Sequence, residues 1–288
     1  MSSKFKSWFI RTGPVKTHFI EAGEGDPLIL IHGGGPGASG EHNWRNNIDA
    51  LSHHFHVFAL DLIGYGLTDK PAIEYSYQAK VDQLANFIDV LCLEKVHLGG
   101  NSMGSYVVVR YALDRPEHVK KVIMVATATV AGALNLGKVS EQGNTVRVQV
   151  GEKPDRESMR AWLEMLLFNK DRITNELLDG RVRLACLPGA WEAQQSYRDF
   201  SRRIAKDPTL QQWYDISQRL PKVTFPFALI WGKEDRFAPT ELAYRMRDAL
   251  PNLKGFYLVE NAGHQVQNDQ PEKFNELVID FLKPSDTC

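Results

Sequence analysis

The feature that most constrains this chain is the pentapeptide Gly-Asn-Ser-Met-Gly at residues 100–104, which lies between strand and helix signals. Residues 95–99 form a short apolar strand segment, and residues 105–114 are helix-compatible and stop at Arg115-Pro116. A serine on such a sharp turn has a strained backbone and points its hydroxyl out of the sheet. The flanking glycines avoid clashes with the neighbouring strand or helix. The pattern predicts that Ser102 is a nucleophile; the alternative is an ordinary glycine-rich turn.

Apolar runs and helical spacing alternate along the rest of the chain. The runs expected to form buried strands cover residues 28–31, 57–60, 96–98, 122–125, 227–231 and 255–259. Runs of this kind, separated by helices, indicate a parallel sheet that is buried on both faces. From about residue 132 the pattern changes to charged, helical windows at 157–167, 171–178 and 191–204. We therefore predict an α/β fold with a mostly parallel central sheet flanked by helices, built from residues 1–131 and 222–288, with a helical lid at 132–221.

Composition excludes several classes of function. The net charge of −1 over 288 residues gives no electrostatic basis for binding nucleic acid or an acidic membrane. The three cysteines, Cys92, Cys186 and Cys288, are scattered and have no metal-ligand spacing. Residues 1–5 lack the apolar run of a signal peptide, and no stretch is long enough for a membrane span. We expect a cytoplasmic protein without a disulfide framework, metal or cofactor.

A serine hydroxyl needs a base and a group that orients the base. Asp235 follows the expected strand at 227–231, and His264 follows the one at 255–259, which gives the chain order serine, acid, histidine. Both would lie at the carboxyl edge of the sheet, where sites form in open α/β sheets. The sequence therefore predicts a catalytic triad of Ser102, Asp235 and His264.

Other acids and histidines are weaker candidates for these roles. Glu234 and Glu260 lie near the same strand ends, and a structural salt bridge is the simpler role for either. His53, His54 and His56 resemble a metal-binding tract, but the run precedes a strand and no second cluster supplies further ligands. The oxyanion formed in acyl chemistry needs preorganised N–H donors. The backbone of Met103 and the loop His-Gly-Gly-Gly-Pro-Gly-Ala at residues 32–38 are the expected sources.

Four segments together resemble a known family. The glycine loop at 32–38, the pentapeptide at 100–104, the Trp-Gly-Lys-Glu-Asp-Arg-Phe segment at 231–237 and Gly263-His264 are similar to the meta-cleavage product hydrolases. These are carbon–carbon bond hydrolases of the α/β-hydrolase superfamily that act in bacterial breakdown of aromatic compounds. The likeness extends from Thr17 to Leu282, so it implies an α/β-hydrolase fold for nearly the whole chain.

The resemblance implies a substrate and roles for individual residues. The family cleaves 2-hydroxy-6-oxo-dienoic acids by ketonisation of the dienol, attack on the remote carbonyl and C–C cleavage. By this resemblance the backbone amides of Gly34 and Met103 would form the oxyanion hole, and Asn43 and Asn101 would position the dienoate. Arg181 would contact the substrate carboxylate, since a guanidinium suits a planar anion. The alternative for Arg181 is a surface ion pair.

The predicted pocket also departs from the family pattern. Phe168 resembles an aromatic pocket residue of the lid, with core packing as the alternative. Gln265 follows the catalytic histidine where the family usually has tryptophan, and Val182 replaces an aromatic after the lid arginine. Both changes would make the pocket less aromatic, with Gln265 among its substrate-binding residues.

Three functions therefore remain open at this point. The first is a C–C hydrolase acting on a small-molecule carboxylate, and the second is a carboxylesterase, enol-lactonase or amidase with the same triad. The third is a ligand-binding or scaffold protein on a hydrolase fold. We expect no nucleic-acid or membrane partner. Because the family is often dimeric or larger, a homodimer or higher homo-oligomer is a further expectation.

Overall fold

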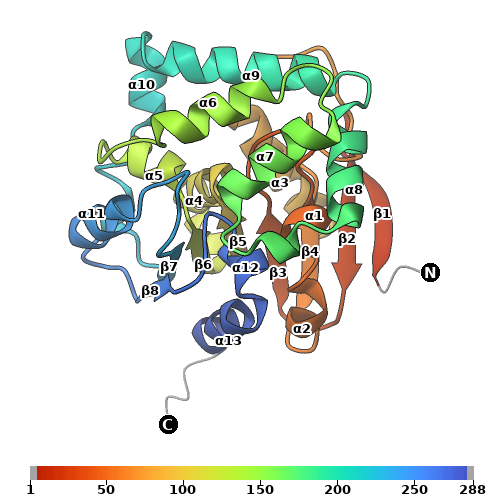
Figure 1. Ribbon diagram of the computed structural model, residues 1–288. Helices are drawn as coiled ribbons and strands as arrows, with labels where there is room; N and C mark the ends of the chain where they lie inside the picture. The colour runs from red at the N-terminus through yellow and green to blue at the C-terminus, as the bar shows by residue number, and fades with distance from the viewer. Residues whose placement is uncertain (1–4, 284–288) are drawn as a thin grey trace.

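Eight strands form a single sheet in the order β1-β2-β4-β3-β5-β6-β7-β8 (Figure 1). The computed structural model describes residues 5–283. The strands are β1 (Lys6–Thr12), β2 (Val15–Ala22), β3 (Pro27–Ile31), β4 (His56–Leu60), β5 (Val96–Asn101), β6 (Val119–Val125), β7 (Phe227–Gly232) and β8 (Gly255–Val259). β2 is antiparallel to both β1 and β4, whereas all pairs from β4 to β8 are parallel. The predicted mostly parallel sheet is confirmed.

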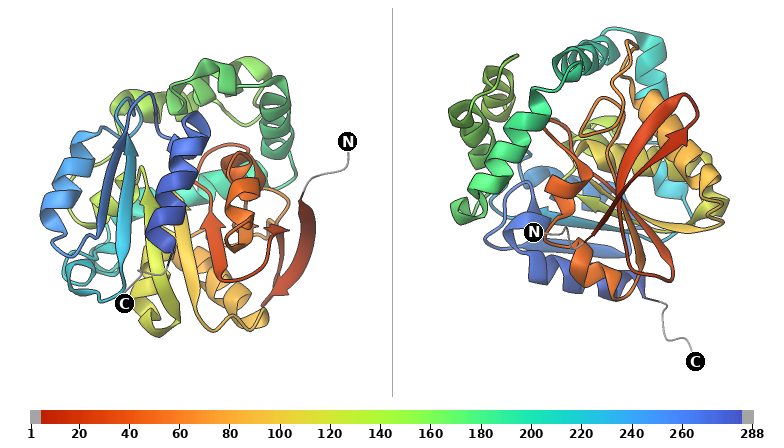
Figure 2. Two further views of the ribbon diagram at one scale, coloured as in Figure 1. Left: turned by 90° about the horizontal axis from the view of Figure 1, so that it is seen from below. Right: turned by 90° about the vertical axis from the view of Figure 1, so that its right-hand side faces the viewer.

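Helices cover both faces of this sheet. They are α1 (Gly40–Trp44), α2 (Ile48–Ser52), α3 (Tyr77–Val90), α4 (Met103–Asp114), α5 (Ala128–Ala133), α6 (Glu141–Gln149), α7 (Arg156–Leu166), α8 (Asn175–Ala185), α9 (Ala190–Ile204), α10 (Pro208–Tyr214), α11 (Glu241–Ala249), α12 (Val266–Asp269) and α13 (Pro271–Leu282). Figure 2 shows α2 and α13 on one side of the sheet and α3 on the other, where α3 packs against α4. The strands are therefore buried on both faces, as their continuous apolar runs require.

The segment between β6 and β7 supplies the helices α5 to α10, and most of it lies above the sheet in Figure 1. The windows expected at 157–167 and 191–204 correspond to α7 and α9. The window at 171–178 is instead split, because Thr174 caps α8 by accepting a hydrogen bond from the Leu177 N–H. The exact limits of the lid, 132 and 221, remain a prediction.

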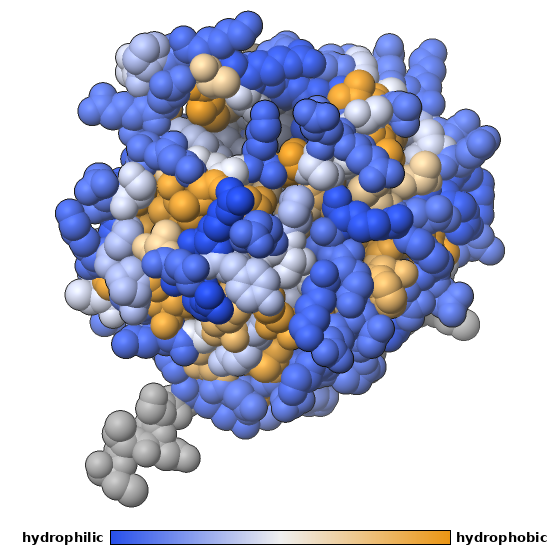
Figure 3. Space-filling view, turned by 60° about the vertical axis from the view of Figure 1, so that its left-hand side comes forward, coloured by the Kyte–Doolittle hydropathy of each residue, from blue (hydrophilic) through white to orange (hydrophobic). Residues whose placement is uncertain are grey.

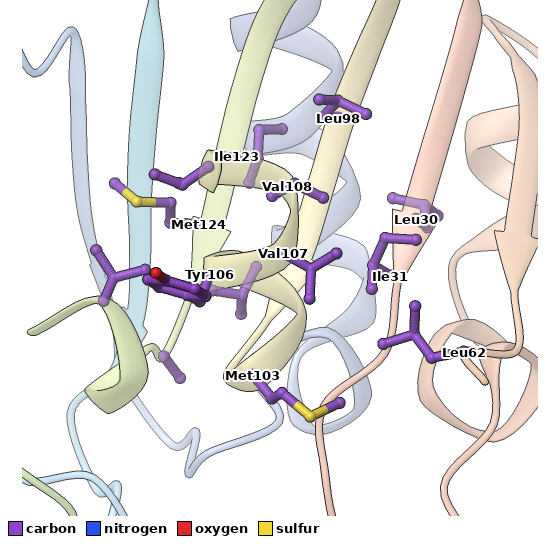
Figure 4. Close-up of a cluster of buried hydrophobic side chains, with 14 of the residues drawn as sticks. Leu30, Ile31, Leu62, Leu98, Met103, Tyr106, Val107, Val108, Ile123 and Met124 are labelled. Carbon is purple, nitrogen blue, oxygen red and sulfur yellow. The ribbon is translucent and has the colours of Figure 1, made fainter. Parts of the chain in front are cut away.

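The helix that follows Ser102 is anchored by the apolar core. Figure 4 shows side chains of α4 packed against those of β3, β5 and β6. The labelled members of this cluster are Leu30, Ile31, Leu62, Leu98, Met103, Tyr106, Val107, Val108, Ile123 and Met124, and all are buried. Fully burying a side chain of this size stabilises a fold by about 1.5–3 kcal/mol. The start of α4 is therefore fixed relative to three strand ends.

Several elements were not predicted from the sequence. β1 pairs with β2 at the edge of the sheet, but most of its side chains are exposed, so it lacks the apolar run of a buried strand. α6 buries only Gly143 among its own residues and therefore has no apolar face to detect. Hydrophobic periodicity finds elements that bury a face, and these two do not.

The outside of the molecule is mostly hydrophilic on the face in Figure 3, with hydrophobic residues in scattered groups. Within residues 5–283, no helix combines the length and the apolar character needed to cross a bilayer. Cys92 and Cys186 are free and exposed, and Cys288 lies outside the described residues.

Asp61 links the end of β4 to the segment that carries the glycine loop. Its buried carboxylate accepts hydrogen bonds from the Gly40 N–H at 2.7 Å and the Leu67 N–H at 2.8 Å, and it contacts His18 Nδ1 at 2.7 Å. Burial alone would raise the pKa of Asp61, but the hydrogen bond from His18 and its charge hold that pKa below its usual value. Asp61 is therefore an ionised acceptor for three donors.

We expect Asp61→Ala to lower the free energy of unfolding by about 3–5 kcal/mol, because it leaves buried donors without an acceptor. Urea unfolding followed by circular dichroism would measure the loss. Asp280→Ala, which removes an exposed carboxylate from α13, is the matched control and should change the free energy by less than about 0.5 kcal/mol. Equal stability of the two variants would contradict this role of Asp61.

Candidate active site

Ser102 lies on a strained turn between β5 and α4. Its backbone has φ 53° and ψ −115°, in the left-handed half of conformational space, and its N–H donates to the Val125 carbonyl at 2.8 Å. A Cβ on Gly100 would clash with the backbone of Gly104, and one on Gly104 would clash with the Ile31 carbonyl. Both flanking glycines are therefore needed for α4 to start this close to the strands.

His264 and Asp235 form a buried pair next to the serine. His264 Nδ1 lies 2.8 Å from Asp235 Oδ2, while Asp235 Oδ1 accepts the N–H groups of Phe237 at 2.9 Å and Ala238 at 2.7 Å. These three contacts restrict rotation of the carboxylate, so it holds the imidazole in one orientation. His264 Nε2 is buried without a hydrogen-bond partner and lines the same cavity as Ser102. This arrangement leaves Nε2 free to accept a proton.

The rival acids and histidines have other contacts. Glu234 accepts the Ala262 N–H at 3.0 Å, and Glu260 forms an exposed ion pair with Lys233 at 2.7 Å. His56 contacts Glu21 at 2.8 Å. Among the residues described, no group of three or more histidine, cysteine or acidic side chains could hold a metal ion.

A cavity of about 460 Å³ contains the reactive groups. It brings together six of the residues predicted from the sequence, namely Gly34, Asn101, Ser102, Met103, His264 and Gln265. Residues from the lid and the loops supply the rest of its walls, and these are Thr129, Val139, Arg147, Trp162, Leu166, Tyr197 and Phe237, together with Gly33 of the glycine loop. Asp235 lies behind His264, while Asn43, Phe168 and Arg181 do not line this cavity.

The glycine loop is held tightly on both sides. Gly35 has φ 113°, and a Cβ there would press on the Trp162 ring; Gly37 has φ 64°, and a Cβ there would meet the Arg181 carbonyl. His32 fixes the start of the loop, because its Nε2 accepts the Leu62 N–H at 3.0 Å and its Nδ1 contacts the Gly33 carbonyl at 2.7 Å. Burial lowers the pKa of His32 to about 4, so the ring is neutral near pH 7.

Asn101 and Gln265 contact the protein as well as the cavity. The Asn101 amide donates to the His264 carbonyl at 3.1 Å and to the Val125 carbonyl at 3.3 Å, so it positions the histidine loop. Gln265 Oε1 accepts from Asn268 at 2.9 Å, and Asn268 also donates to the Asn43 carbonyl at 3.2 Å. Direct contacts of Asn43, Asn101 and Gln265 with a dienoate stay predictions.

Arg181 is buried rather than paired at the surface. Its side chain is 1% exposed, and Nη1 donates to the Pro36 carbonyl at 3.2 Å while Nε has no partner. No ion pair in the described part of the chain includes it. Burial lowers its pKa to about 10, so the guanidinium is still charged near pH 7. The Asn43 amide nitrogen is likewise buried without a partner.

Phe168 is placed differently from the expectation that it lines the pocket. Its side chain is 44% exposed. The reason is Asp269, whose carboxylate accepts the N–H groups of Phe168 at 3.0 Å, Asn169 at 2.9 Å and Gly263 at 2.8 Å. These bonds connect the lid to the loop that carries His264 and leave the phenyl ring outside the cavity. Inside the cavity, Trp162, Tyr197 and Phe237 supply the aromatic surface instead.

The sequence analysis did not identify the lid residues Trp162 and Arg147 as part of the cavity wall. Trp162 lies in a predicted helical window, but nothing in the pattern separates an aromatic residue that faces the core from one that faces a cavity. Arg147 belongs to α6, for which no helix was predicted. Without a predicted helix, nothing in the sequence indicated that the Arg147 side chain would reach the cavity.

The chain is similar to known proteins over nearly its whole length. The family described as alpha/beta hydrolase fold matches residues 26–271. A 2-hydroxy-6-oxo-6-(2'-aminophenyl)hexa-2,4-dienoic acid hydrolase of Metapseudomonas resinovorans is 31% identical over 97% of this chain and 92% of its own length. A 2-hydroxy-6-oxononadienedioate/2-hydroxy-6-oxononatrienedioate hydrolase of Paraburkholderia xenovorans is 28% identical over 98% and 95%. The solved structure of a meta-cleavage product hydrolase from Pseudomonas fluorescens IP01 superposes with a TM-score of 0.80, at 30% identity and 96% coverage of both chains.

These matches agree with the sheet order and with the motifs at the strand ends. The chain belongs to the α/β-hydrolase family, and within it to the meta-cleavage product hydrolases.

We expect Asp235→Asn to lower kcat by about 10⁴-fold, because an amide cannot hold the imidazole in the tautomer that leaves Nε2 free. Hydrolysis of the best substrate found for the protein would be measured at saturation. Glu260→Gln is the matched control, since it removes an exposed carboxylate from the neighbouring strand end, and should retain kcat within about twofold. A near-normal rate in Asp235→Asn would overturn the assignment of the acid.

Proposed function

We propose that this protein is a serine-dependent hydrolase that cleaves a C–C bond in a 2-hydroxy-6-oxo-dienoate, a meta-cleavage product of aromatic degradation. Two relatives that cover nearly the whole chain are named as hydrolases of such acids. The arrangement of Ser102, His264 and Asp235 supports the nucleophile, base and orienting acid that the reaction needs.

One observation carries the proposal from a general serine hydrolase to this substrate class. Three buried hydrogen-bond donors near the glycine loop have no partner, namely Asn43 Nδ2, Trp162 Nε1 and Arg181 Nε. Trp162 lines the cavity, whereas Asn43 and Arg181 do not. A buried donor without an acceptor costs about 1–3 kcal/mol, more when it is charged. An acid with a carboxylate and a neighbouring 2-oxygen offers three acceptors and a negative charge, so it suits these donors better than a neutral ester does.

The proposed reaction has two stages. In the first, the 2-hydroxyl of the dienol loses a proton and C5 gains one, which converts the dienol into a ketone. In the second, His264 Nε2 accepts the Ser102 proton as Oγ adds to the C6 carbonyl, and the N–H groups of Gly34 and Met103 hold the resulting oxyanion. The C5–C6 bond then breaks, the electron pair moves toward the 2-oxo end, and the proton held by His264 neutralises the departing dienolate. Water then adds to the acyl carbonyl as His264 accepts its proton, and the acid leaves as Ser102 regains that proton.

A second candidate is an ester, enol-lactone or amide hydrolase with the same triad. Gln265 favours it, because an amide side chain in the cavity wall replaces the apolar surface that an aromatic residue would give. The reaction is decided by which bond the cavity holds beside Ser102, since the triad serves both. In either case the proposed partner is a small molecule, and a cytoplasmic location stays part of the proposal.

We expect the protein to bleach the visible absorbance of a 2-hydroxy-6-oxo-dienoate in a way that Ser102→Ala abolishes. Arg181→Gln should lower kcat/KM for this acid by about 100-fold, because it removes a charged hydrogen bond to the carboxylate. Arg183→Gln, on the same helix but exposed, is the matched control and should stay within about twofold.

Rapid turnover of short acyl esters, unaffected by Arg181→Gln and without bleaching of the dienol at micromolar enzyme, would favour the second candidate. Absence of both activities, together with no covalent labelling of Ser102 by a fluorophosphonate, would revive a non-catalytic role.

A further inference from the structure

A second arginine, Arg147 of α6, reaches the cavity that holds Ser102 and His264. Its Nε is buried without a hydrogen-bond partner, and Nη2 donates to Asn144 Oδ1 at 2.6 Å. The guanidinium carbon lies 6.0 Å from the centre of the Phe237 ring, which in turn lies 4.7 Å from the His264 ring. Only one aromatic ring therefore separates this charge from the catalytic base.

The charge of Arg147 is not neutralised by the protein. Within residues 5–283, no ion pair includes Arg147 or its neighbour Arg198, which donates from Nη2 to the Arg147 carbonyl at 3.3 Å. Burial lowers the pKa of Arg198, and the nearby charges of Arg147 and Arg202 lower it further. Two cations that repel each other and lack an acid are a favourable place for an anion.

An open groove of about 1120 Å³ leads to this point between α6 and α9. It shares Val139, Arg147 and Tyr197 with the cavity around Ser102, so Arg147 lies where the two meet. Lys138, Arg198 and Arg202 also line the groove, and Glu141 is the acid among the lining residues. Arg202 is paired with Asp199 at 3.0 Å, which leaves Lys138, Arg147 and Arg198 to set a positive potential.

Arg147 approaches the reactive centre from a different part of the lid than Arg181 does. α8, which carries Arg181, packs against α1 and lies beside it in Figure 1, whereas α6 lies above α5. The donors proposed to hold the dienoate belong to the α8 and glycine-loop side. A linear substrate with its C6 carbonyl at Ser102 extends in both directions, so its far end would run toward α6.

We infer that Arg147, supported by Arg198, binds a second acidic group at the far end of the substrate, beyond the carbonyl that is attacked. The substrate class is then a 2-hydroxy-6-oxo-dienedioate, and the acyl product is a dicarboxylic acid. This inference rests on the proposed function and goes beyond it, because the two relatives described above act on substrates with different far ends, one a carboxylate and one an aminophenyl group.

The test compares two substrates of equal chain length, 2-hydroxy-6-oxonona-2,4-dienedioate and 2-hydroxy-6-oxonona-2,4-dienoate, which differ in whether the far end is a carboxylate or a methyl group. The ratio of their kcat/KM values is the readout. In the wild type we expect a preference for the dioate of about tenfold or more. In Arg147→Gln this ratio should fall to within about threefold of one, whereas Arg183→Gln should keep the wild-type ratio.

Two further measurements keep the test valid if Arg147→Gln folds poorly. Arg147→Lys retains a positive charge and should keep part of the preference. In the wild type, raising the salt concentration should reduce the preference, since ions screen the attraction at the mouth of the groove.

The outcomes separate the two proposals. Turnover of both substrates with a wild-type ratio near one would overturn this inference and leave the proposed function standing. An equal loss for both substrates in Arg147→Gln would also overturn it, because Arg147 would then act on the shared dienoate end. No turnover of either substrate would overturn the proposed function and this inference together.

Discussion

The sharp turn between β5 and α4 is the constraint on which the rest of the site depends. The backbone at Ser102 is held in an unfavourable conformation, and such strain persists only where surrounding contacts outweigh it. Here the apolar side chains of α4 pack on β3, β5 and β6, and glycines at 100 and 104 allow that close approach. The hydroxyl is therefore fixed at the carboxyl edge of the sheet. Asp235, which follows β7, and His264, which follows β8, lie at the same edge.

Burial of positive charge is the second organising feature. A guanidinium withdrawn from water and left without an acid is costly, so its presence inside an enzyme indicates that a ligand completes its contacts. Arg181 beside the glycine loop meets this description, whereas Arg147 at the mouth of the cavity is half-buried and has a buried Nε without a partner. Arg147 lines the cavity and Arg181 lies beside the glycine loop, and their positive charges suit an acid better than a simple ester.

Most of the sheet could be predicted from the sequence, and so could the proximity of Ser102, His264 and Asp235, whereas half of the pocket could not. The buried strands have continuous apolar runs, and Ser102, Asp235 and His264 each come a few residues after such a run, so one-dimensional patterns locate them. Phe168 was expected in the pocket and lies at the surface, because Asp269 holds its backbone from a segment about a hundred residues away. Trp162 and Arg147 were not predicted, since the orientation of a lid helix over the sheet leaves no trace in local periodicity.

The sequence by itself determined the α/β architecture, the order of serine, acid and histidine, and the glycine loop that faces them. These features depend on short-range requirements: buried runs for strands, glycines for close backbone approach, and polar residues at strand ends. Only the tertiary structure decided which lid side chains line the cavity, that Arg181 is buried, and that Arg147 lines the same cavity as His264. Those contacts join segments that are distant in the chain, and their geometry is fixed by how the lid packs on the core.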